Sequence, residues 1–390
     1  MILNRIYFDH NATTPVLEEV FEAMVPYLKD QWGNPSSIHW AGRGTRKAVE
    51  DGREKVCALL NCAPLEIVFT SSGTEGDNHA IKGVAYARKD KGNHIITTKV
   101  EHPAVLNTCK HLAREGFDVT YLDVDGDGLI DLEELKKAIT PKTILITVMF
   151  ANNETGVLFP IDEIGAIAKG RGVTFHTDAV QSAGKHPMDL RKLNVDLLTI
   201  SGHKLYAPKG VGALYVRRGV RLVPLIHGGH HERNRRGGTE NVAGIVGMGV
   251  AAEIAARDMA REIGHLSMLR DRIEAGFKAR VQHIKVNGHP EKRLANTTNI
   301  SFEFVEGESL LLNLDMKGIA ASSGSACTSG SLEPSHVLLA MGLSHEMSHG
   351  SVRFSLGKSN TVEEVDFLLE AMPPIVERMR SMSPLYAGAK

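Results

Sequence analysis

The chain has 390 residues, which is long enough for two domains with well-buried cores. Its 45 basic and 46 acidic side chains give a formal net charge of −1, which argues against electrostatic binding to nucleic acid or to an anionic membrane. The longest apolar run, residues 242–252, is too short to span a bilayer, and we expect neither a signal peptide nor a disulfide scaffold, so we predict a cytoplasmic protein with reduced thiols.

From about residue 65, short β-rich runs alternate with helix-length segments. This alternation predicts a mostly parallel sheet with helices on both faces, and the nearly continuous apolar strand cores agree with it. The expected strands are Ile67–Thr70, His94–Val100, Val119–Val124, Ile144–Phe150, Val173–Asp178, Leu197–Ser201 and Gly212–Val216. The expected helices between them include Glu75–Arg88, Ala104–Glu115 and Ile161–Gly170.

After a long helical region at about 241–280, the pattern changes to one that predicts a smaller α+β domain. The segments expected there are the strands Thr297–Phe304 and Ser351–Leu356 and the helices 307–317 and 361–381. The first dozen residues are expected to join this domain. We therefore divide the chain into a large domain, residues 15–260, and a small domain, residues 1–14 and 261–390.

Lys204 and Asp178 carry the strongest chemical signal. Lys204 follows the apolar strand Leu197–Ser201, and a partly desolvated lysine has a lowered pKa that frees its amine to form a Schiff base. Asp178 ends the preceding expected strand, and a carboxylate there could keep a pyridine nitrogen protonated as an electron sink. The pair indicates pyridoxal 5'-phosphate, although each residue alone would suit a surface lysine or a helix cap.

Other polar groups also fall at the carboxyl ends of expected strands, where ligands bind in such sheets. The turn Thr70–Gly76 precedes a helix, so its backbone N–H groups and the Thr74 hydroxyl could hold a phosphate, or the turn could be an ordinary helix cap. His102 could stack on a cofactor and move protons, or cap the next helix. Asn153 could bind a carboxylate or a ring substituent, or merely form a turn.

Two residues of the small domain could take part in catalysis. Cys327 lies in the small-residue stretch 320–330, a composition that suits a mobile loop, and a single thiol there suits a nucleophile that travels between sites. Cys57 and Cys109 lie in apolar helical patterns and suit burial. Arg353 is expected in a strand, where it could fork onto a substrate carboxylate or form a surface salt bridge.

Two segments resemble metal sites. Asp123–Glu134 matches the calcium-binding EF-hand pattern, with acids at loop positions 1, 3, 5, 9 and 12 and glycine at 6. An EF-hand needs an entering helix, whereas 117–122 reads as a strand, so we interpret the match as an acidic turn before a helix at Leu132–Ile139. The segment His227–Glu232 resembles a metal cluster, but its tandem glycines better suit close approach to an anion or a neighbouring subunit.

Taken together, the motifs resemble those of the cysteine desulfurases, and the resemblance extends over nearly the whole chain. The extended cysteine loop is most similar to the nitrogenase-associated branch of that family. The motifs are Tyr7–Thr14, Gly33–Ser37, Glu101–His102, Asn152–Gly156, His176–Gln181, Ser201–Lys204 and Ser322–Ser329.

The resemblance implies an α/β fold of the aspartate-aminotransferase-like kind (pyridoxal-phosphate transferase fold type I), with a mostly parallel seven-stranded sheet plus a smaller α+β domain. It also implies a homodimer with active sites between its subunits. Lys204 would hold the cofactor and move the substrate's Cα proton, Asp178 would pair with the ring nitrogen, and His102 would act as acid and base. Further cofactor ligands would be Gln181 at the ring hydroxyl and, at the phosphate, Gly73, Thr74, Ser201, His203 and the partner's Thr239.

The activity implied by the resemblance is removal of sulfur from L-cysteine. Asn153 and Arg353 would bind the substrate carboxylate, and the Cys327 thiolate would take the sulfur as a persulfide, releasing alanine. The sulfur would pass to an iron–sulfur scaffold, in particular for nitrogenase maturation, and Cys327 could ligate a cluster shared with that scaffold. The alternatives are a selenocysteine or cysteine-sulfinate lyase of the same fold, a calcium-binding module built on Asp123–Glu134, and a cofactor-bearing scaffold without turnover.

Overall fold

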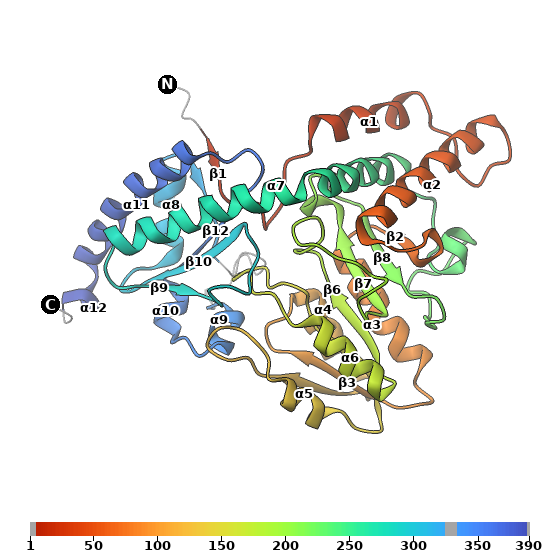
Figure 1. The fold of residues 1–390 in the computed structure, drawn as a ribbon, viewed down its shortest axis with the longest axis horizontal. Coiled ribbons are helices and arrows are strands. Elements are labelled where there is room, and N and C mark those ends of the chain that lie inside the picture. Colours follow the sequence, from red (N-terminus) through yellow and green to blue (C-terminus); the bar gives the residue numbers. More distant parts are fainter. Residues whose placement is uncertain (1–4, 324–333, 388–390) are drawn as a thin grey trace.

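The larger part of the chain is an α/β unit built on one seven-stranded sheet (Figure 1). The computed structural model describes residues 5–323 and 334–387. In sheet order the strands are β2 (Ile67–Thr70), β8 (Gly212–Val216), β7 (Leu197–Ser201), β6 (Thr174–Asp178), β5 (Thr143–Thr147), β3 (His94–Thr98) and β4 (Asp118–Leu122). Only β8 runs antiparallel to its neighbours, so the mostly parallel sheet predicted from the sequence is confirmed.

Helices cover both faces of this sheet, because successive residues of each strand point to opposite sides. Ile95 and Leu197 pack in one core with α3 and α4, whereas Ile96 and Leu198 pack in the other core with α2, α6 and the first half of α7. The helices of this part are α1 (Glu18–Lys29), α2 (Trp40–Leu60), α3 (Gly73–Ala87), α4 (Pro103–Arg114), α5 (Leu132–Ala138) and α6 (Ile161–Arg171), with the short 3-10 helices η1 (Pro64–Glu66), η2 (Gly202–Lys204) and η3 (His231–Asn234).

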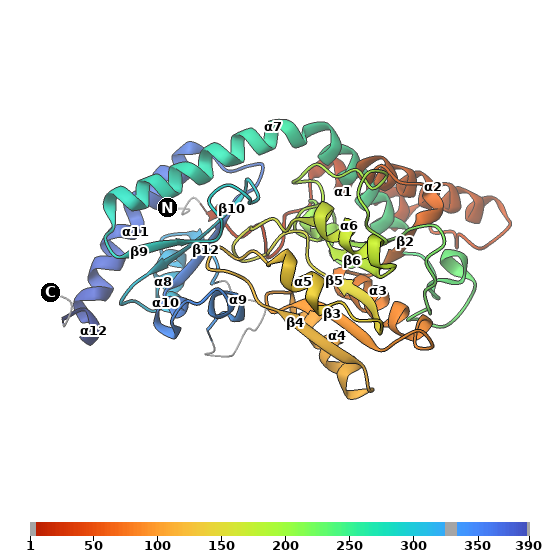
Figure 2. The same ribbon diagram turned by 60° about the horizontal axis from the view of Figure 1, so that its bottom comes forward.

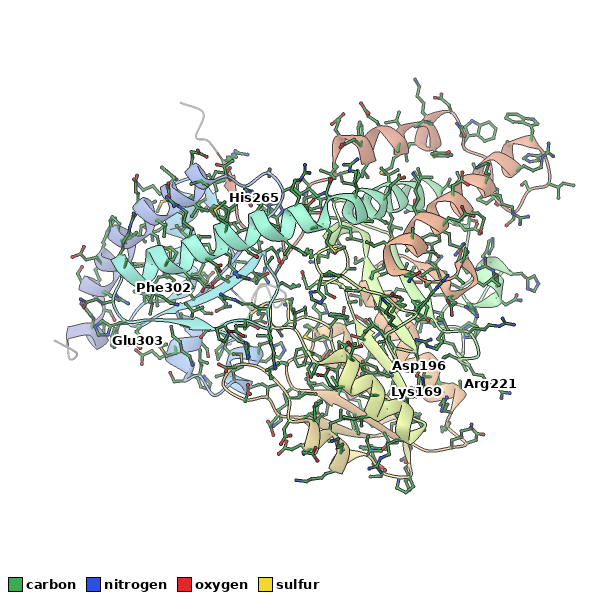
Figure 3. The ribbon with its side chains drawn as sticks, in the orientation of Figure 1. Lys169, Asp196, Arg221, His265, Phe302 and Glu303 are labelled. Carbon is green, nitrogen blue, oxygen red and sulfur yellow. The ribbon has the colours of Figure 1, made fainter. Side chains whose placement is uncertain are left out.

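The smaller part has its own antiparallel sheet and its own core. Phe302, in its central strand, lies beneath the long helix α7 (Figure 3), with its ring centroid 5.6 Å from that of Phe277. The sheet has the order β12 (Ser351–Ser355), β10 (Thr297–Phe302) and β9 (Ile284–Asn287), and beside it lies the parallel pair β1 (Ile6–Tyr7) and β11 (Ile319–Ala320). Its helices are α8 (Gly307–Asp315), α9 (His336–Ala340), α10 (His345–His349), α11 (Val362–Met382) and α12 (Pro384–Ala387).

Helix α7 (Val242–Arg280) connects the two parts and contributes to both cores (Figure 2). Its buried residues from Ala243 to Ala255 belong to the large part, and those from Leu266 to Phe277 belong to the small part. No residue of the helix between these two groups is buried. We propose on this ground that the domain boundary lies near residue 260, with residues 1–14 in the small domain, as the pairing of β1 with β11 suggests.

The sequence patterns predicted most elements of the large sheet but not all of the helices. The strands β2, β7 and β8 have the predicted bounds, and β3, β4 and β5 end two or three residues earlier than predicted. Helices α1 and α2 are absent from the sequence prediction. Within the described residues, no helix is both long and apolar enough to cross a membrane.

A buried ion pair fastens α7 to the segment that enters β10. The Glu274 carboxylate accepts hydrogen bonds from Arg293 Nη1 at 2.5 Å and from Thr298 Oγ1 at 2.7 Å. The side chains of Glu274 and Arg293 are 8% and 6% exposed. Removing one member of such a pair leaves the other charge buried without compensation, which makes the pair a sensitive point for stability.

We predict that Glu274→Gln lowers the free energy of unfolding by about 3 kcal/mol, because Arg293 then keeps only the longer, 3.9 Å contact with the exposed carboxylate of Asp271. The matched control is Asp366→Asn, which breaks the solvent-exposed ion pair between Asp366 of α11 and Arg272 of α7, the helix that also carries Glu274. That control is expected to change stability little. Urea unfolding followed by circular dichroism compares the two variants, and equal midpoints would contradict the prediction.

Candidate active site

A cavity of about 340 Å³ opens at the carboxyl ends of the parallel strands. This is the edge of an α/β sheet at which ligands bind. Ten of the residues predicted from the sequence line it: Gly73, Thr74, His102, Asn153, Asp178, Gln181, Ser201, His203, Lys204 and Arg353. The fold therefore brings together side chains from segments that are almost 300 residues apart in the sequence.

Lys204 enters the cavity from η2, directly after strand β7. Its Nζ donates hydrogen bonds to the backbone carbonyls of Asn11 at 2.5 Å and Ala12 at 2.6 Å. Both carbonyls belong to the N-terminal segment that follows β1. The lysine amine is thus held between the large sheet and a segment that pairs with the small part of the chain.

Asp178 ends the neighbouring strand β6, which pairs in parallel with β7 so that Asp178 lies opposite Thr199. Its Oδ1 accepts the Val180 backbone N–H at 2.9 Å. Burial raises the pKa of Asp178 to about 6, although that N–H group and the Lys204 charge favour the ionised form. The carboxylate is therefore desolvated and ready to accept a proton or to pair with a cationic ring nitrogen.

The first turn of α3 also lines the cavity. Ser72 is the N-cap, and its Oγ accepts the Glu75 backbone N–H at 3.1 Å. A Cβ on Gly73 would lie 2.7 Å from Val180 Cγ2, so only glycine lets the helix approach so closely. The Ser201 hydroxyl is buried and has no hydrogen-bond partner among the described residues. An unpaired hydroxyl beside a helix N-terminus fits a bound phosphate group.

These residues fit pyridoxal phosphate. Lys204 would hold the aldehyde, Asp178 the ring nitrogen, and the turn at Gly73 with Ser201 the phosphate. Thr74 is exposed at the same turn, and Gln181 lines the cavity beside the lysine.

His102 both caps α4 and lines the cavity. Its Nδ1 accepts the Ala104 backbone N–H at 3.1 Å, so the neutral ring carries its proton on Nε2. Burial, reinforced by the charges of Lys204 and His336, lowers the pKa of His102 to about 4. Burial and the Lys204 charge also lower the pKa of His203 to about 4. Both histidines are therefore neutral at physiological pH.

Arg353, in β12, reaches the cavity from the small part. Its Nη2 binds Asp9 Oδ1 at 2.7 Å, and its Nη1 donates to the Asn153 carbonyl at 3.0 Å. The arginine side chain is only 3% exposed, so the alternative of a surface salt bridge is wrong. Its Nε is buried and has no partner among the described residues, and this leaves a donor for an anionic ligand.

Cys327 lies outside the described residues, but the chain on either side of its segment is fixed at the cavity. Before the segment, Ser322 exchanges backbone hydrogen bonds with Arg353. After it, Ser335 Oγ donates to Glu154 Oε2 at 2.5 Å, and His336 Nε2 bonds the Glu101 carbonyl at 3.0 Å. Ser322 therefore contacts a lining residue, Arg353, whereas Ser335 and His336 contact residues adjacent in sequence to the lining residues Asn153 and His102.

Thr239 does not line the cavity of its own chain. It is exposed in the loop between η3 and α7. This placement leaves its predicted role as a ligand in the partner's site as a prediction.

Sequence reasoning missed several residues that line the cavity. Asp77 has the clearest signal, since it follows Thr74 by three residues and so lies on the same face of α3. Burial and the charge of Asp178 raise the pKa of Asp77 well above its usual range. The other missed residues are Asn11, Ala12, Ser72, Met149, Ala151 and Val180.

The EF-hand-like segment folds as an acidic turn entered from strand β4. Asp125 Oδ1 accepts the backbone N–H groups of Asp127 and Leu129, each at 2.9 Å, and Asp131 caps α5. In the second segment with metal-like residues, Glu232 forms a buried ion pair with Arg53. Over residues 5–323 and 334–387, no group of three or more His, Cys, Asp or Glu side chains is arranged to hold a metal ion.

Comparison with known proteins places the chain in one family. Residues 6–368 match the class-V aminotransferase family. A cysteine desulfurase from Trichormus azollae is 57% identical over 97% of this chain and 94% of the relative. A protein named cysteine desulfurase IscS from Methanosarcina thermophila is 55% identical over 97% of this chain and 94% of the relative.

Comparison with solved structures supports the same family. A structure named as a NifS-like protein superposes with a TM-score of 0.90 at 40% identity, covering 96% of this chain and 99% of the other. The NifS-like protein from Rickettsia africae ESF-5 has a TM-score of 0.87 at 32% identity, covering 96% of this chain and all of the other. The chain therefore belongs to the class-V aminotransferase family and, within it, to the pyridoxal-phosphate-dependent cysteine desulfurases.

Proposed function

We propose that this enzyme removes sulfur from L-cysteine, releasing L-alanine and leaving a persulfide on Cys327. One observation carries the proposal. Lys204, Asp178 and Arg353 line a single cavity, and Ser322, which precedes the Cys327 segment, is hydrogen-bonded to Arg353. A cofactor amine site and a carboxylate-binding arginine are thus available in one place.

When bound, pyridoxal phosphate supplies a sink for the electrons released at the substrate's Cα. Asp178, with its desolvated carboxylate, would keep a proton on the ring nitrogen. Lys204 would hold the cofactor and would then move the Cα proton of the substrate. Gln181 would bind the ring hydroxyl, and Gly73, Thr74, Ser201 and His203 would hold the phosphate.

Arg353 would orient the substrate by binding its carboxylate through the unpaired Nε, with Asn153 beside it. A guanidinium that is already fixed by Asp9 and the Asn153 carbonyl needs little rearrangement to do so. His102, neutral and with its Nδ1 occupied by the cap, can exchange a proton only through Nε2. His102 would therefore act as an acid or base through this one nitrogen atom.

The sulfur-transfer step balances without an external oxidant. The Cys327 thiolate attacks the substrate's sulfur, an S–S bond forms, and the Cβ–S bond breaks with its electron pair remaining on the carbon fragment. Protonation of that carbon completes alanine, so cysteine and one thiol give alanine and one persulfide. Another thiol can accept the persulfide sulfur.

The acceptor that we propose is an iron–sulfur scaffold protein, because a relative at 55% identity bears the name cysteine desulfurase IscS. The assignment to nitrogenase maturation and a cluster ligand role for Cys327 rest on the sequence resemblance alone. A reducing, cytoplasmic setting would keep Cys327 as the thiol that the reaction needs.

We also propose that the enzyme is a homodimer. Three large apolar side chains, Trp32 and Ile38 between α1 and α2 and Trp40 at the start of α2, are 74%, 90% and 76% exposed in the single chain. Apolar surface of this kind favours burial by a partner. A second copy would cover it and would bring its own exposed Thr239 to the phosphate end of this cavity.

The reaction is tested by Cys327→Ala, for which we expect retained cofactor absorption but no alanine from L-cysteine, because only the sulfur acceptor is removed. Lys204→Ala is expected to lose both the cofactor absorption and the formation of alanine. Measurement of alanine with cysteine, selenocysteine and cysteine sulfinate separates the alternatives. Undiminished cysteine turnover by Cys327→Ala would contradict the persulfide step, and turnover of selenocysteine alone by the wild type would identify a selenocysteine lyase.

The dimer is tested by mixing a Lys204→Ala subunit with a Thr239→Ala subunit. If Thr239 acts across the interface, each mixed dimer contains one intact site and one with both defects. We therefore expect about half of wild-type activity per mixed dimer, isolated with two affinity tags. Activity no higher than that of the Thr239→Ala homodimer would show that the threonine acts within its own chain or not at all.

The pH dependence of cofactor capture tests Asp178. Because burial raises its pKa to about 6 in the empty site, the carboxylate is ionised above that pH and protonated below it. We expect the affinity of the apoenzyme for pyridoxal phosphate to fall as the pH drops through about 6. In Asp178→Asn this step should disappear while the cofactor's own titrations persist, and an identical profile in both proteins would contradict the role of Asp178.

A further inference from the structure

The carboxamide of Gln181 is held from both sides. Its Nε2 donates to the Asn11 carbonyl at 3.0 Å, and its Oε1 accepts a hydrogen bond from Lys185 Nζ at 3.3 Å. The Asn11 carbonyl is also bound by Lys204 Nζ at 2.5 Å. The amide nitrogen of Gln181 and the amine of Lys204 thus meet at one oxygen atom on the wall of the cavity.

Lys185 decides which way this amide faces. A primary amide has a donor end and an acceptor end of nearly equal size, so its orientation depends on its partners. A lysine ammonium has donors only and can bind only the oxygen end. With Oε1 engaged by Lys185, the NH2 group is turned toward Asn11 and Lys204.

The proposed reaction gives Lys185 no task, yet its position is costly. The side chain lies half-buried four residues after Gln181. Burial, together with the charges of Lys204 and Arg353, lowers the pKa of Lys185 to about 7. The Lys185 charge also lowers the pKa of the buried His10, although burial is the larger cause there. An amine crowded by two cations is expected to persist only where its hydrogen bond is needed.

We propose that Lys185 is a positioning residue that fixes the Gln181 carboxamide with its NH2 group toward the bound cofactor. This inference rests on the proposed function, in which Gln181 faces the hydroxyl of the cofactor ring. An ionised ring hydroxyl accepts hydrogen bonds and would be repelled by an amide oxygen. Lys185 thereby ensures that the pocket presents a donor to that oxygen, and it adds a positive charge behind the amide.

The test compares reconstituted wild-type enzyme with Lys185→Met. We expect the dissociation constant for pyridoxal phosphate to rise about tenfold, on the scale of one hydrogen bond to a charged group. We also expect the pH midpoint of the long-wavelength absorption of the bound cofactor to rise by about one unit. Loss of the donor and loss of the nearby positive charge both favour the protonated form, so both effects have the same sign.

A double-mutant cycle separates this role from simple packing. Gln181→Leu alone should shift the midpoint in the same direction as Lys185→Met, and Lys185→Met should shift it less in the Gln181→Leu background than in the wild type, because only the charge is then still lost. Independent, additive shifts would show that Lys185 does not act through Gln181. Lys185→Arg keeps the charge and the donors and should keep the wild-type midpoint. Lys192→Met is the matched control, since Lys192 lies on the same segment with its side chain 84% exposed.

The outcomes also separate this inference from the proposed function. Wild-type enzyme that binds no pyridoxal phosphate, or releases no alanine from cysteine, would overturn the proposed function. Wild-type enzyme that does both, with an unchanged dissociation constant and midpoint in Lys185→Met, would overturn only the role of Lys185. If Lys185→Met does not fold, Lys185→Gln, which is uncharged and shorter, replaces it in the same measurements with the same expected shifts.

Discussion

The active site depends on the parallel pairing of β6 with β7. Asp178 lies opposite Thr199 in this register, and the chain reaches Lys204 five residues later. Parallel strands present their carboxyl ends at one edge of the sheet. Asp178 and Lys204 therefore reach the same cavity although they are not neighbours in the sequence. A slip of one residue would turn Asp178 to the other face of the sheet, and the register is therefore a condition for the chemistry.

Burial then sets the charge of the groups at that edge. Desolvation raises the pKa of Asp178 to about 6 and that of Glu101 to about 8, and it lowers the pKa of His102 to about 4. Glu101 is consequently protonated at neutral pH and His102 is neutral. The guanidinium of Arg353 is thus left to bind anionic ligands, and Asp178 remains ionised at neutral pH.

The small part of the chain completes a site that the large sheet only begins. The Asn11 and Ala12 carbonyls hold the Lys204 amine, and Arg353 arrives from β12. Asp9 binds Arg353, so two segments from opposite ends of the chain are joined at the cavity. Because α7 contributes buried residues to both cores, the two parts are held by one continuous helix.

The sequence alone determined the order of most strands and helices in the large part. It also determined which residues at the strand ends could bind ligands or take part in catalysis. Alternating apolar runs and strand-end polar residues are local signals, and Lys204, Asp178, His102 and the turn at Gly73 all carry them. Helices α1 and α2 were not predicted, because α1 contains a proline, Pro26, and α2 contains two glycines in its first five residues. Strands β3, β4 and β5 also end two or three residues earlier than the apolar patterns predicted.

Only the tertiary structure decided what those residues touch. Nothing local shows that the Asn11 carbonyl meets both Lys204 and Gln181, that Lys185 donates a hydrogen bond to the amide of Gln181, or that Arg353 is buried against Asp9. The EF-hand pattern was satisfied residue by residue, yet a strand enters it where a helix is needed. Such facts depend on contacts between distant segments and on desolvation, which arise only when the chain is packed.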